Sequence, residues 1–413
     1  MRPQRIEFAH TKYSRHQNAK HKLLRSLSDF HKNDDRTMTT YNYVSASTLP
    51  HAPSQTDTTT SSVIYRPFGI LRFALAILVL LQHGLHLMPS MDVLPSFGVA
   101  AVAVFFAISG FIVVEANATF YSGRPGNFLL NRFLRIIPPY LAAMLVSVAI
   151  HQFLYTKGAL ELWDHKLSGP PMQPLVILSG LLSILPGMRA DIVSGQNFTF
   201  IPFAWSLRIE LTFYLLAFLV YFLMSLRQRY IPQWLCRWSP HLIVMAGYAL
   251  SLAYMIDGGI GPRQQTNIPW FLFGISLYLA WRQRSPLHYG FLLFSTLFAL
   301  AIFPLWPQRS NTTEMDWQLG VLTILSVTFI ALAFVPRVTG LLKIIDKNLG
   351  DLAYALYINH FAVLLLLSNL TSARGWSIYF LGMALSIIVA IIMHRAVEIP
   401  LLHLRDKIRG TKL

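Results

Sequence analysis

Long apolar stretches alternate with short polar ones over most of this 413-residue chain. Runs of roughly 17 to 25 mostly apolar residues, the length that lets a helix cross the hydrocarbon core of a bilayer, recur ten times. The pattern predicts an all-α polytopic membrane bundle of about ten transmembrane helices. The expected helices cover residues 68–88, 96–116, 137–156, 205–225, 240–257, 266–282, 287–306, 318–336, 349–369 and 376–396.

The polar segments set the expected domain boundaries. Residues 1–65 are polar, basic and rich in Ser and Thr, without the apolar core of a signal peptide, which predicts a disordered cytoplasmic tail. The transmembrane domain is expected over 66–398, followed by a basic cytoplasmic tail over 399–413. Residues 174–187 are apolar but short and bounded by Pro and Gly, so we expect a re-entrant or interfacial segment within the outer loop 157–204. If this segment spanned the membrane, every later helix would cross the membrane in the opposite direction.

Composition and charge distribution agree with a membrane protein. Hydrophobic residues make up 54% and charged residues 13% of the chain, with a mean hydropathy of +0.48, against roughly 25% charged residues in an ordinary soluble domain. The net charge of +16 would also suit a nucleic-acid-binding protein. With a cytoplasmic N-terminus, however, 26 Lys and Arg lie in cytoplasmic segments and 6 in outer loops, with Arg72 and Arg208 inside helices. The positive-inside rule therefore predicts that both termini are cytoplasmic, and no nucleic-acid partner is needed.

The first expected helix carries ionisable residues, which are costly in hydrocarbon. Arg72 and His83 are eleven residues apart in LRFALAILVLLQH, which places them on one helix face and about 16 Å apart along the axis. Arg72 lies near the cytoplasmic leaflet, where its side chain can also snorkel to the interface. His83 lies in the outer half without such an exit, whereas His86 fits the outer interface. We therefore expect His83 to be a functional group.

The fourth expected helix, in FAWSLRIELTFYLL, enters from the outer side and carries a carboxylate. Trp205 then lies at the outer interface, and Glu210 lies five residues deeper on the same helix face as Ser206. His83 has a similar expected depth, so a contact with Glu210 would fix the tautomer of the imidazole and strengthen it as a base. The alternative is a structural pairing of Glu210 with Arg208 or with a polar group of another helix.

Polar groups in the second and ninth expected helices have both a structural and a functional interpretation. Ser109 and Gly110 permit either close helix packing, the commoner reason for small residues, or a narrow passage beside the backbone. Tyr357 and His360 are three residues apart and share a helix face near mid-membrane. A packed, hydrogen-bonded histidine fits this position as well as a catalytic one.

Two arginines stand at the cytoplasmic start of the third expected helix. Arg132 and Arg135 are one helical turn apart in NRFLRIIPPY, a spacing that suits the oxygens of a phosphate group. Basic residues at cytoplasmic helix ends are also routine in membrane proteins. The pair alone therefore leaves phosphate binding and topology as alternatives.

Six fragments of the chain occur together in an order typical of one family. They are RFALAILVLLQH, VFFAISGF, NFLLNRFLRIIPPY, WSLRIELTFYLL, LGDLAYALYINH and the closing VEIP, spread over most of residues 65–405. In these fragments the chain resembles the acyltransferase-3 family of integral-membrane acyltransferases, which modify carbohydrates and other acceptors. The resemblance implies an O-acyltransferase with acyl-CoA, usually acetyl-CoA, as donor, and we expect it in the bacterial cytoplasmic membrane.

The resemblance also implies roles for individual residues. His83 matches the catalytic histidine of the first-helix motif, and Glu210 matches the glutamate of the Trp-Ser-Leu-x-x-Glu element. The residues expected to hold the donor are Arg72, Arg132, Arg135, Ser109 and Gly110. Further candidates are His360, Tyr357, Trp205 and Ser206.

The chain departs from the family pattern at three positions. Many relatives have an aspartate where this chain has Ala103, a second acidic residue where it has Leu211, and a tryptophan where it has Asn359. These differences predict a divergent acceptor subgroup.

The expected reaction moves an acyl group from cytoplasmic acyl-CoA to a hydroxyl of a cell-surface or exported glycan, with His83 as general base supported by Glu210. An acyl-histidine relay is the alternative route. The single cysteine, Cys236, excludes a thiolate metal cluster, and no metal is expected. The rival class is a transporter or exporter that uses the same buried charges. A third possibility is a scaffold without activity. Acceptor identity, acyl chain length and oligomeric state stay open.

Overall fold

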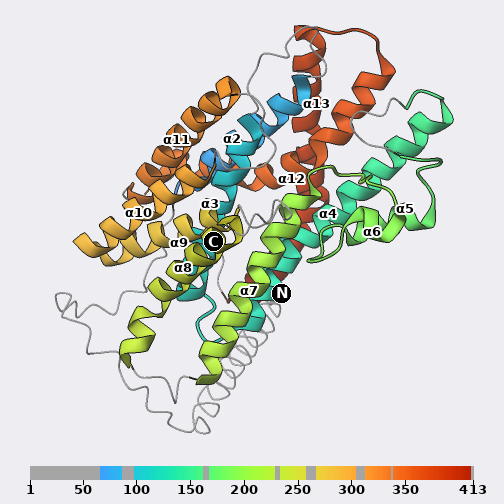
Figure 1. Ribbon diagram of the computed structural model, residues 1–413. Coiled ribbons are helices and arrows are strands. Elements are labelled where there is room, and N and C mark those ends of the chain that lie inside the picture. Colours follow the sequence, from blue (N-terminus) through green and yellow to red (C-terminus); the bar gives the residue numbers. More distant parts are fainter. Residues whose placement is uncertain are drawn as a thin grey trace, which may run out of the picture. The chain divides into compact units, whose positions relative to one another are not determined.

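All regular structure in the described part of the chain is helical (Figure 1). The computed structural model describes residues 66–85, 97–160, 167–227, 233–256, 267–303, 312–335 and 338–410. The predicted tail over 1–65 and His86 lie outside the described residues. The helices are α2 (Phe68–Gly84), α3 (Phe97–Thr119), α4 (Pro125–Thr156), α5 (Pro174–Leu182), α6 (Ala190–Ser194), α7 (Ala204–Arg227), α8 (Gln233–Ile256), α9 (Ile268–Gln283), α10 (Pro286–Ile302), α11 (Thr312–Phe334), α12 (Gly340–Leu370), α13 (Trp376–Met393), the π-helix η5 (His394–Glu398) and α14 (Ile399–Arg409).

The predicted apolar runs coincide with helices of the structure. Each of the ten runs overlaps one of α2, α3, α4 or α7 to α13. Among the described residues, six helices are long and apolar enough to cross a membrane, and shorter apolar helices lie at Phe68–Gly84, Pro240–Ala253 and Pro286–Ile302. The all-α class is thus confirmed, and the helices are those of an integral membrane protein. The count of ten and the cytoplasmic side of the termini stay predictions.

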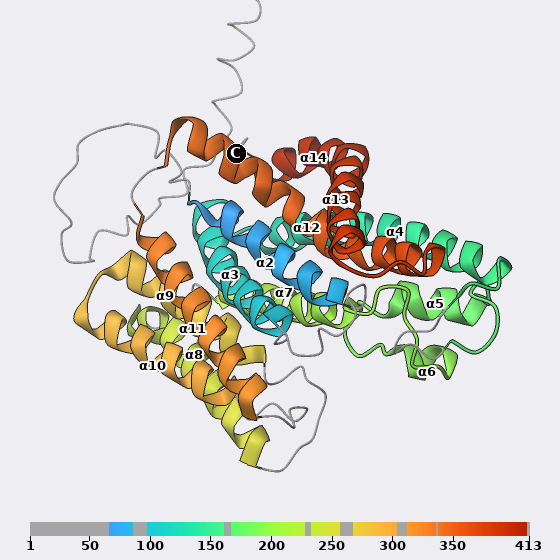
Figure 2. The same ribbon diagram turned by 90° about the horizontal axis from the view of Figure 1, so that it is seen from above.

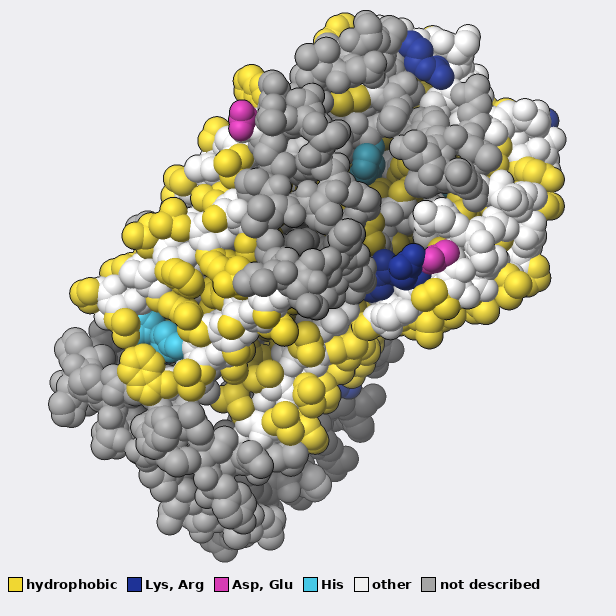
Figure 3. All heavy atoms as spheres, in the orientation of Figure 1, with side chains coloured by type: hydrophobic (Ala, Val, Ile, Leu, Met, Phe, Trp, Pro, Cys, Tyr) yellow, Lys and Arg dark blue, Asp and Glu magenta, His cyan; other side chains and the backbone are white. Residues whose placement is uncertain are grey.

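The outward faces of the helices are apolar. Large side chains such as Leu216 of α7, Leu293 of α10 and Ile392 of α13 are more than half exposed. Figure 3 shows apolar side chains spread over the helices of one face, with few charged groups among them. Such a surface is costly in water and favourable against lipid acyl chains. It therefore supports a membrane environment for these helices.

Helix α2 packs most extensively against α12, and glycines make this contact close (Figure 2). A Cβ atom on Gly69 would lie 1.9 Å from the carbonyl oxygen of Asp346, and one on Gly350 would lie 2.6 Å from the Cα atom of Gly69. The buried Asp346 carboxylate accepts hydrogen bonds from the backbone N–H groups of Gly69 and Ile70 at 3.0 and 2.7 Å. Asp346 thus caps the first turn of α2 and fixes it beside α12.

A second close contact joins α3 to α9. A Cβ atom on Gly110 would lie 2.1 Å from the carbonyl oxygen of Phe271, and one on Gly274 would lie 1.8 Å from that of Ala107. Small residues at both positions therefore let the two helix backbones approach each other.

Gly274→Ala should destabilise the protein by roughly 1–3 kcal/mol, because the added methyl group forces α3 and α9 apart. Gly320 of α11 provides the control, since a Cβ atom there meets nothing within 4 Å. Thermal unfolding of both variants in detergent checks the prediction. Equal melting temperatures for Gly274→Ala and Gly320→Ala would contradict the role of Gly274 in packing.

The chain before α7 is folded back into the helix bundle. Helix α5 has nine residues, about 14 Å at 1.5 Å per residue, which is less than half of the roughly 30 Å hydrocarbon core. Phe198, Phe200 and Phe203 are at most 4% exposed. Ser147 of α4 donates a hydrogen bond to the carbonyl oxygen of Phe200 at 2.7 Å. Helix α7, which starts at Ala204, therefore begins inside the fold.

The C-terminal segment is part of the helical fold. Helix α13 continues through η5 into α14, and α14 packs against α4. The Asn131 side chain of α4 donates a hydrogen bond to the carbonyl oxygen of Arg405 at 2.9 Å. In the described part of the predicted basic cytoplasmic tail over 399–413, residues 399–409 form helix α14, which is docked on α4.

Candidate active site

Helices α2, α7 and α12 carry polar side chains at two levels of the bundle. Arg72 of α2 lies beside Gly350 of α12, and His83 lies beside His360 further along both helices. The two helices therefore run in the same direction, and the two levels are about 16 Å apart along α2. We call the first level the arginine cavity and the second the histidine pair.

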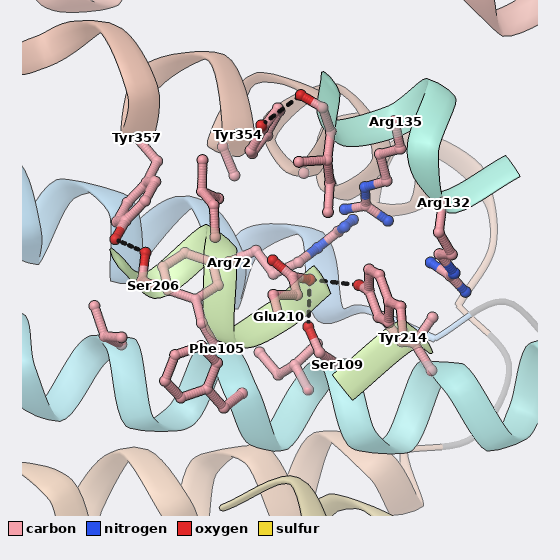
Figure 4. Close-up of a pocket in the computed structure, with 18 residues that line it drawn as sticks. Arg72, Phe105, Ser109, Arg132, Arg135, Ser206, Glu210, Tyr214, Tyr354 and Tyr357 are labelled. Carbon is pink, nitrogen blue, oxygen red and sulfur yellow. Dashed lines mark hydrogen bonds between the residues drawn. The ribbon is translucent and has the colours of Figure 1, made fainter. Parts of the chain in front are cut away.

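The arginine cavity has a volume of about 70 Å³ and lies among α2, α3, α4, α7 and α12. Figure 4 shows Arg72 and Arg135 reaching into it above Glu210. Arg132 is buried, and its guanidinium carbon lies 5.4 Å from the ring centroid of Tyr214. Within the described part of the chain, neither Arg132 nor Arg135 forms an ion pair. The guanidinium groups of Arg132 and Arg135 are therefore not neutralised by an ion pair with a described carboxylate.

Glu210 belongs to the arginine cavity and not to His83. Its carboxylate accepts hydrogen bonds from the hydroxyl of Ser109, at 2.9 Å, and from the hydroxyl of Tyr214. These partners come from α3 and from α7 itself. The contact with Ser109 of α3 matches the alternative in which Glu210 pairs with a polar group of another helix, and the support of His83 by Glu210 is not among these contacts.

The histidine pair consists of His83 and His360, whose Nδ1 and Nε2 atoms are 2.7 Å apart. His360 is fully buried, and its Nδ1 atom lies 3.2 Å from the carbonyl oxygen of Leu356. The ring of Phe203 stacks on both imidazoles, with centroids 5.7 Å from His83 and 4.7 Å from His360. The orienting partner of His83 is therefore His360, a residue for which the sequence left packing and catalysis as alternatives.

For neutral imidazole rings, the hydrogen-bond partners determine both tautomers. A carbonyl oxygen only accepts, so the Nδ1 atom of His360 carries the proton that is donated to Leu356. The Nε2 atom of His360 is then an acceptor, and His83 donates to it from Nδ1. The lone pair of His83 consequently lies on Nε2. This assignment makes Nε2 the basic atom of the pair.

Ser206 and Tyr357 stand between the two levels. Their hydroxyl groups are 2.7 Å apart, and both residues line the arginine cavity (Figure 4). The Tyr357 ring also lies 4.9 Å from the ring of Phe203 and 6.3 Å from that of His360, measured between centroids. This pair therefore forms the boundary between the cavity and the histidines.

A second, larger cavity adjoins the arginine cavity. This basic chamber has a volume of about 490 Å³ and shares Arg72 and Arg135 with the arginine cavity. Its wall also includes Lys343 and Lys347 at the start of α12 and Arg405 of α14. Sequence reasoning missed these three residues, because it counted them only as topological charges and treated 399–413 as a tail.

The remaining predicted residues lie outside both cavities. Gly110 lies against the backbone of Phe271 of α9, which supports the helix-packing interpretation, and its expected role in holding the donor stays a prediction. Trp205 packs against the hydrophobic core. Arg208 donates hydrogen bonds to the carbonyl oxygens of Ser183 and Met188, which excludes the alternative pairing with Glu210.

The three positions that differ from the family pattern also lie away from the cavities. Ala103, Leu211 and Asn359 are at most 1% exposed and line neither cavity. The amide of Asn359 donates a hydrogen bond within α12, to the carbonyl oxygen of Ala355 at 2.9 Å.

The fold and the site define a helical membrane protein with an arginine-lined cavity next to a buried histidine pair. The chain belongs to the family described as acyltransferase domain (Acyl_transf_3), whose sequence model matches residues 68–395. This membership confirms the resemblance carried by the six fragments and supports an acyltransferase.

Similarity to individual proteins is more limited. The chain is 36% identical over 122 residues to "Protein 2 in picA locus" of Rhizobium radiobacter. The match covers 28% of this chain and 63% of that protein, so the chain spans less than two thirds of the relative's length. No solved structure matches the chain.

Proposed function

We propose that the protein transfers an acyl group, with acetyl as the expected group, from a CoA thioester to a hydroxyl of a cell-surface or exported glycan. The observation that carries this proposal is the junction of two unlike cavities next to the histidine pair. The basic chamber suits a polyanionic nucleotide, and the arginine cavity suits a thin, mostly uncharged arm that ends at a reactive group. A CoA thioester combines these two parts in one molecule.

The sizes of the cavities support this division. The chamber, at about 490 Å³, falls within the range of roughly 300–1,000 Å³ typical of small-molecule sites. The arginine cavity, at about 70 Å³, is too small for a nucleotide and is lined largely by apolar side chains. Its far end is the Ser206–Tyr357 pair beside the histidines. The arm of the donor would therefore point from the arginines toward His83.

The arginines at the junction suit the phosphate groups of the donor. Arg72 and Arg135 line both cavities, so they flank the place where the arm meets the nucleotide. Guanidinium groups bind phosphate oxygens through paired, charge-assisted hydrogen bonds. The Nε atom of Arg132 is buried without a hydrogen-bond partner, which adds a third donor group at this level. Glu210 supports the arginine cavity by holding Ser109 and Tyr214.

His83 acts as the general base in this proposal. Its Nε2 atom removes the proton from the acceptor hydroxyl while the hydroxyl oxygen attacks the carbonyl carbon of the thioester. The carbon–sulfur bond then breaks, and the leaving thiolate takes the proton from the imidazolium, so the products are the acyl ester and free CoA. His360 accepts a hydrogen bond from Nδ1 of His83 throughout. It thereby holds the ring in place and stabilises the imidazolium.

Acyl transfer from labelled acetyl-CoA in membranes tests the proposed function. Membranes with the wild-type protein are incubated with radiolabelled acetyl-CoA, and the glycan fraction is analysed by mass spectrometry for an added, alkali-labile acetyl group. Membranes from cells without the protein provide the control. Equal acetylation in both preparations would contradict the proposal.

Arg135→Gln should weaken the binding of acetyl-CoA by about 10- to 100-fold, because a hydrogen bond to a charged group contributes roughly 1.5–3 kcal/mol. The control is Arg189→Gln, which removes an exposed arginine paired with Asp191 outside both cavities. Titration calorimetry of the purified proteins measures the affinity. Equal affinity of Arg135→Gln and wild type would remove Arg135 from the donor site.

A further inference from the structure

We infer that the basic chamber recognises the 3′-phosphate of CoA through Lys343, Lys347 and Arg405. The donor would then be a thioester of CoA itself, and not a thioester of pantetheine or of a carrier protein, which lack this phosphate. The inference rests on the proposed function and adds the part of the donor that the chamber selects.

The cationic groups form two sets, according to the cavities that they line. Arg72 and Arg135 line both cavities, so they lie nearest to the arm and suit the diphosphate that follows it. Lys343, Lys347 and Arg405 line the chamber alone. They therefore lie farther along the donor, where the remaining phosphate of CoA is the one on the 3′ oxygen of the ribose.

The charge of the chamber calls for a polyanion. Six Lys and Arg residues line it against three carboxylates. Two of these carboxylates already form ion pairs, Glu398 with His394 at 2.8 Å and Asp406 with Arg409 at 2.9 Å. A phosphate monoester carries about 1.5–2 negative charges at neutral pH, so the 3′-phosphate and the diphosphate together suit a wall in which cationic side chains outnumber carboxylates.

Of these three residues, Arg405 has the surroundings that best suit the binding of a phosphate group. Its Nε atom is buried without a hydrogen-bond partner, and it forms no ion pair with a described residue. The charges that act on it are those of Arg132, Arg135 and Arg409, against one carboxylate, Glu398. A half-buried guanidinium among like charges is unfavourable unless an anion joins the cluster.

The backbone at Arg405 is fixed by the fragment that carries the arginine pair. Asn131 of α4, adjacent to Arg132, donates its side-chain N–H to the carbonyl oxygen of Arg405 at 2.9 Å. Asn127, one turn earlier, donates to the carbonyl oxygen of Ile408 at 3.5 Å. These two asparagines hold α14 against α4, so that Arg405 and Arg135 face one chamber.

An anionic lipid offers the same phosphate chemistry. The start of α12 exposes the apolar side chains of Leu341 and Ile344 on either side of Lys343. A headgroup at the membrane surface would thus meet the same lysines, and the experiment must separate the two sources of phosphate. The structure favours the CoA phosphate, since the chamber shares Arg72 and Arg135 with the arginine cavity.

The test compares acetyl-CoA with acetyl-3′-dephospho-CoA as donors in nanodiscs of neutral lipid. For the wild type, loss of the 3′-phosphate should raise KM by about tenfold or more with kcat unchanged, because hydrogen bonds to a charged group are lost. In Lys347→Gln and Arg405→Gln, KM for acetyl-CoA should already be raised, and removing the 3′-phosphate should have little further effect. Lys407→Gln, on the same helix as Arg405 but outside the chamber, should behave as the wild type.

The outcomes separate this inference from the proposed function. Equal KM values for the two donors in the wild type would overturn the inference, whereas absence of transfer from either donor would contradict the proposed function. Arg405→Lys keeps the charge and should retain part of the selectivity, which distinguishes recognition from a folding defect in Arg405→Gln. Phosphatidylglycerol in the nanodiscs provides the lipid arm. Suppose that phosphatidylglycerol competes with acetyl-CoA in the wild type but not in Arg405→Gln, and that loss of the 3′-phosphate leaves KM unchanged. The chamber would then bind lipid, and the inference would be overturned.

Discussion

His83→Ala is expected to lower the rate of acyl transfer by about 10²–10⁴-fold, the range that a positioned general base contributes. The binding of acetyl-CoA should stay within a factor of about two, since His83 lies roughly 16 Å along α2 from Arg72. Initial rates of acetyl ester formation and calorimetric titration of the same preparation measure the two effects.

The control for this variant is His241→Ala, which removes a histidine of α8 that lines neither cavity. It should keep the wild-type rate. A His83→Ala protein with normal expression and an unchanged rate would show that the base is elsewhere. A proportional loss of donor binding would mean that His83 acts in affinity and not in the chemical step.

His360→Phe should lower kcat by about 10²-fold or more while KM for acetyl-CoA stays the same. Phenylalanine keeps a flat ring next to Phe203 but has no nitrogen to accept the hydrogen bond from Nδ1 of His83. The His83 ring then loses the partner that fixes its tautomer and stabilises its imidazolium. In a serine protease, loss of the correct histidine tautomer costs about 10⁴-fold in kcat, which sets the scale.

His360→Gln provides the conservative comparison, because its amide oxygen can accept from Nδ1 of His83. It should restore much of the activity that His360→Phe loses, and steady-state kinetics with acetyl-CoA separates kcat from KM in both variants. Equal activity of His360→Phe and wild type would contradict a positioning role. Equal inactivity of the two variants would show that the imidazole matters for some other reason.

The periodicity of the sequence was sufficient to predict the helices and the polar face of α2. Apolar runs of membrane length coincide with helices because the chain must bury its backbone hydrogen bonds within each segment. The spacing of Arg72 and His83 placed them on one face because an α-helix has 3.6 residues per turn. Tyr357 and His360 were predicted as neighbours for the same reason.

The partners of these residues depend on contacts that a linear pattern does not contain. The expected partner of Glu210 was estimated from the start of an apolar run, whereas in the structure its carboxylate accepts hydrogen bonds from Ser109 and Tyr214. His360 was not recognised as the partner of His83, because the contact depends on the glycine packing of α2 against α12.

The basic chamber could not be predicted from the sequence for a related reason. Arg405 lies in a segment that was predicted as a basic cytoplasmic tail, and the docking of this segment on α4 brings Arg405 to the cavity wall. Lys343 and Lys347 follow the positive-inside pattern whether or not they bind a ligand. A local motif would have been needed to reveal them, and none is present.

In the proposed reaction, a donor held at the arginines reacts at His83. Its most direct test is a single-turnover measurement with radiolabelled acetyl-CoA bound to wild type, Arg135→Gln and His83→Ala, with a host glycan fraction as acceptor. The account predicts that wild type transfers the label, that Arg135→Gln transfers it only at raised donor concentration, and that His83→Ala binds the donor normally and transfers nothing. Transfer by His83→Ala at the wild-type rate would contradict the account.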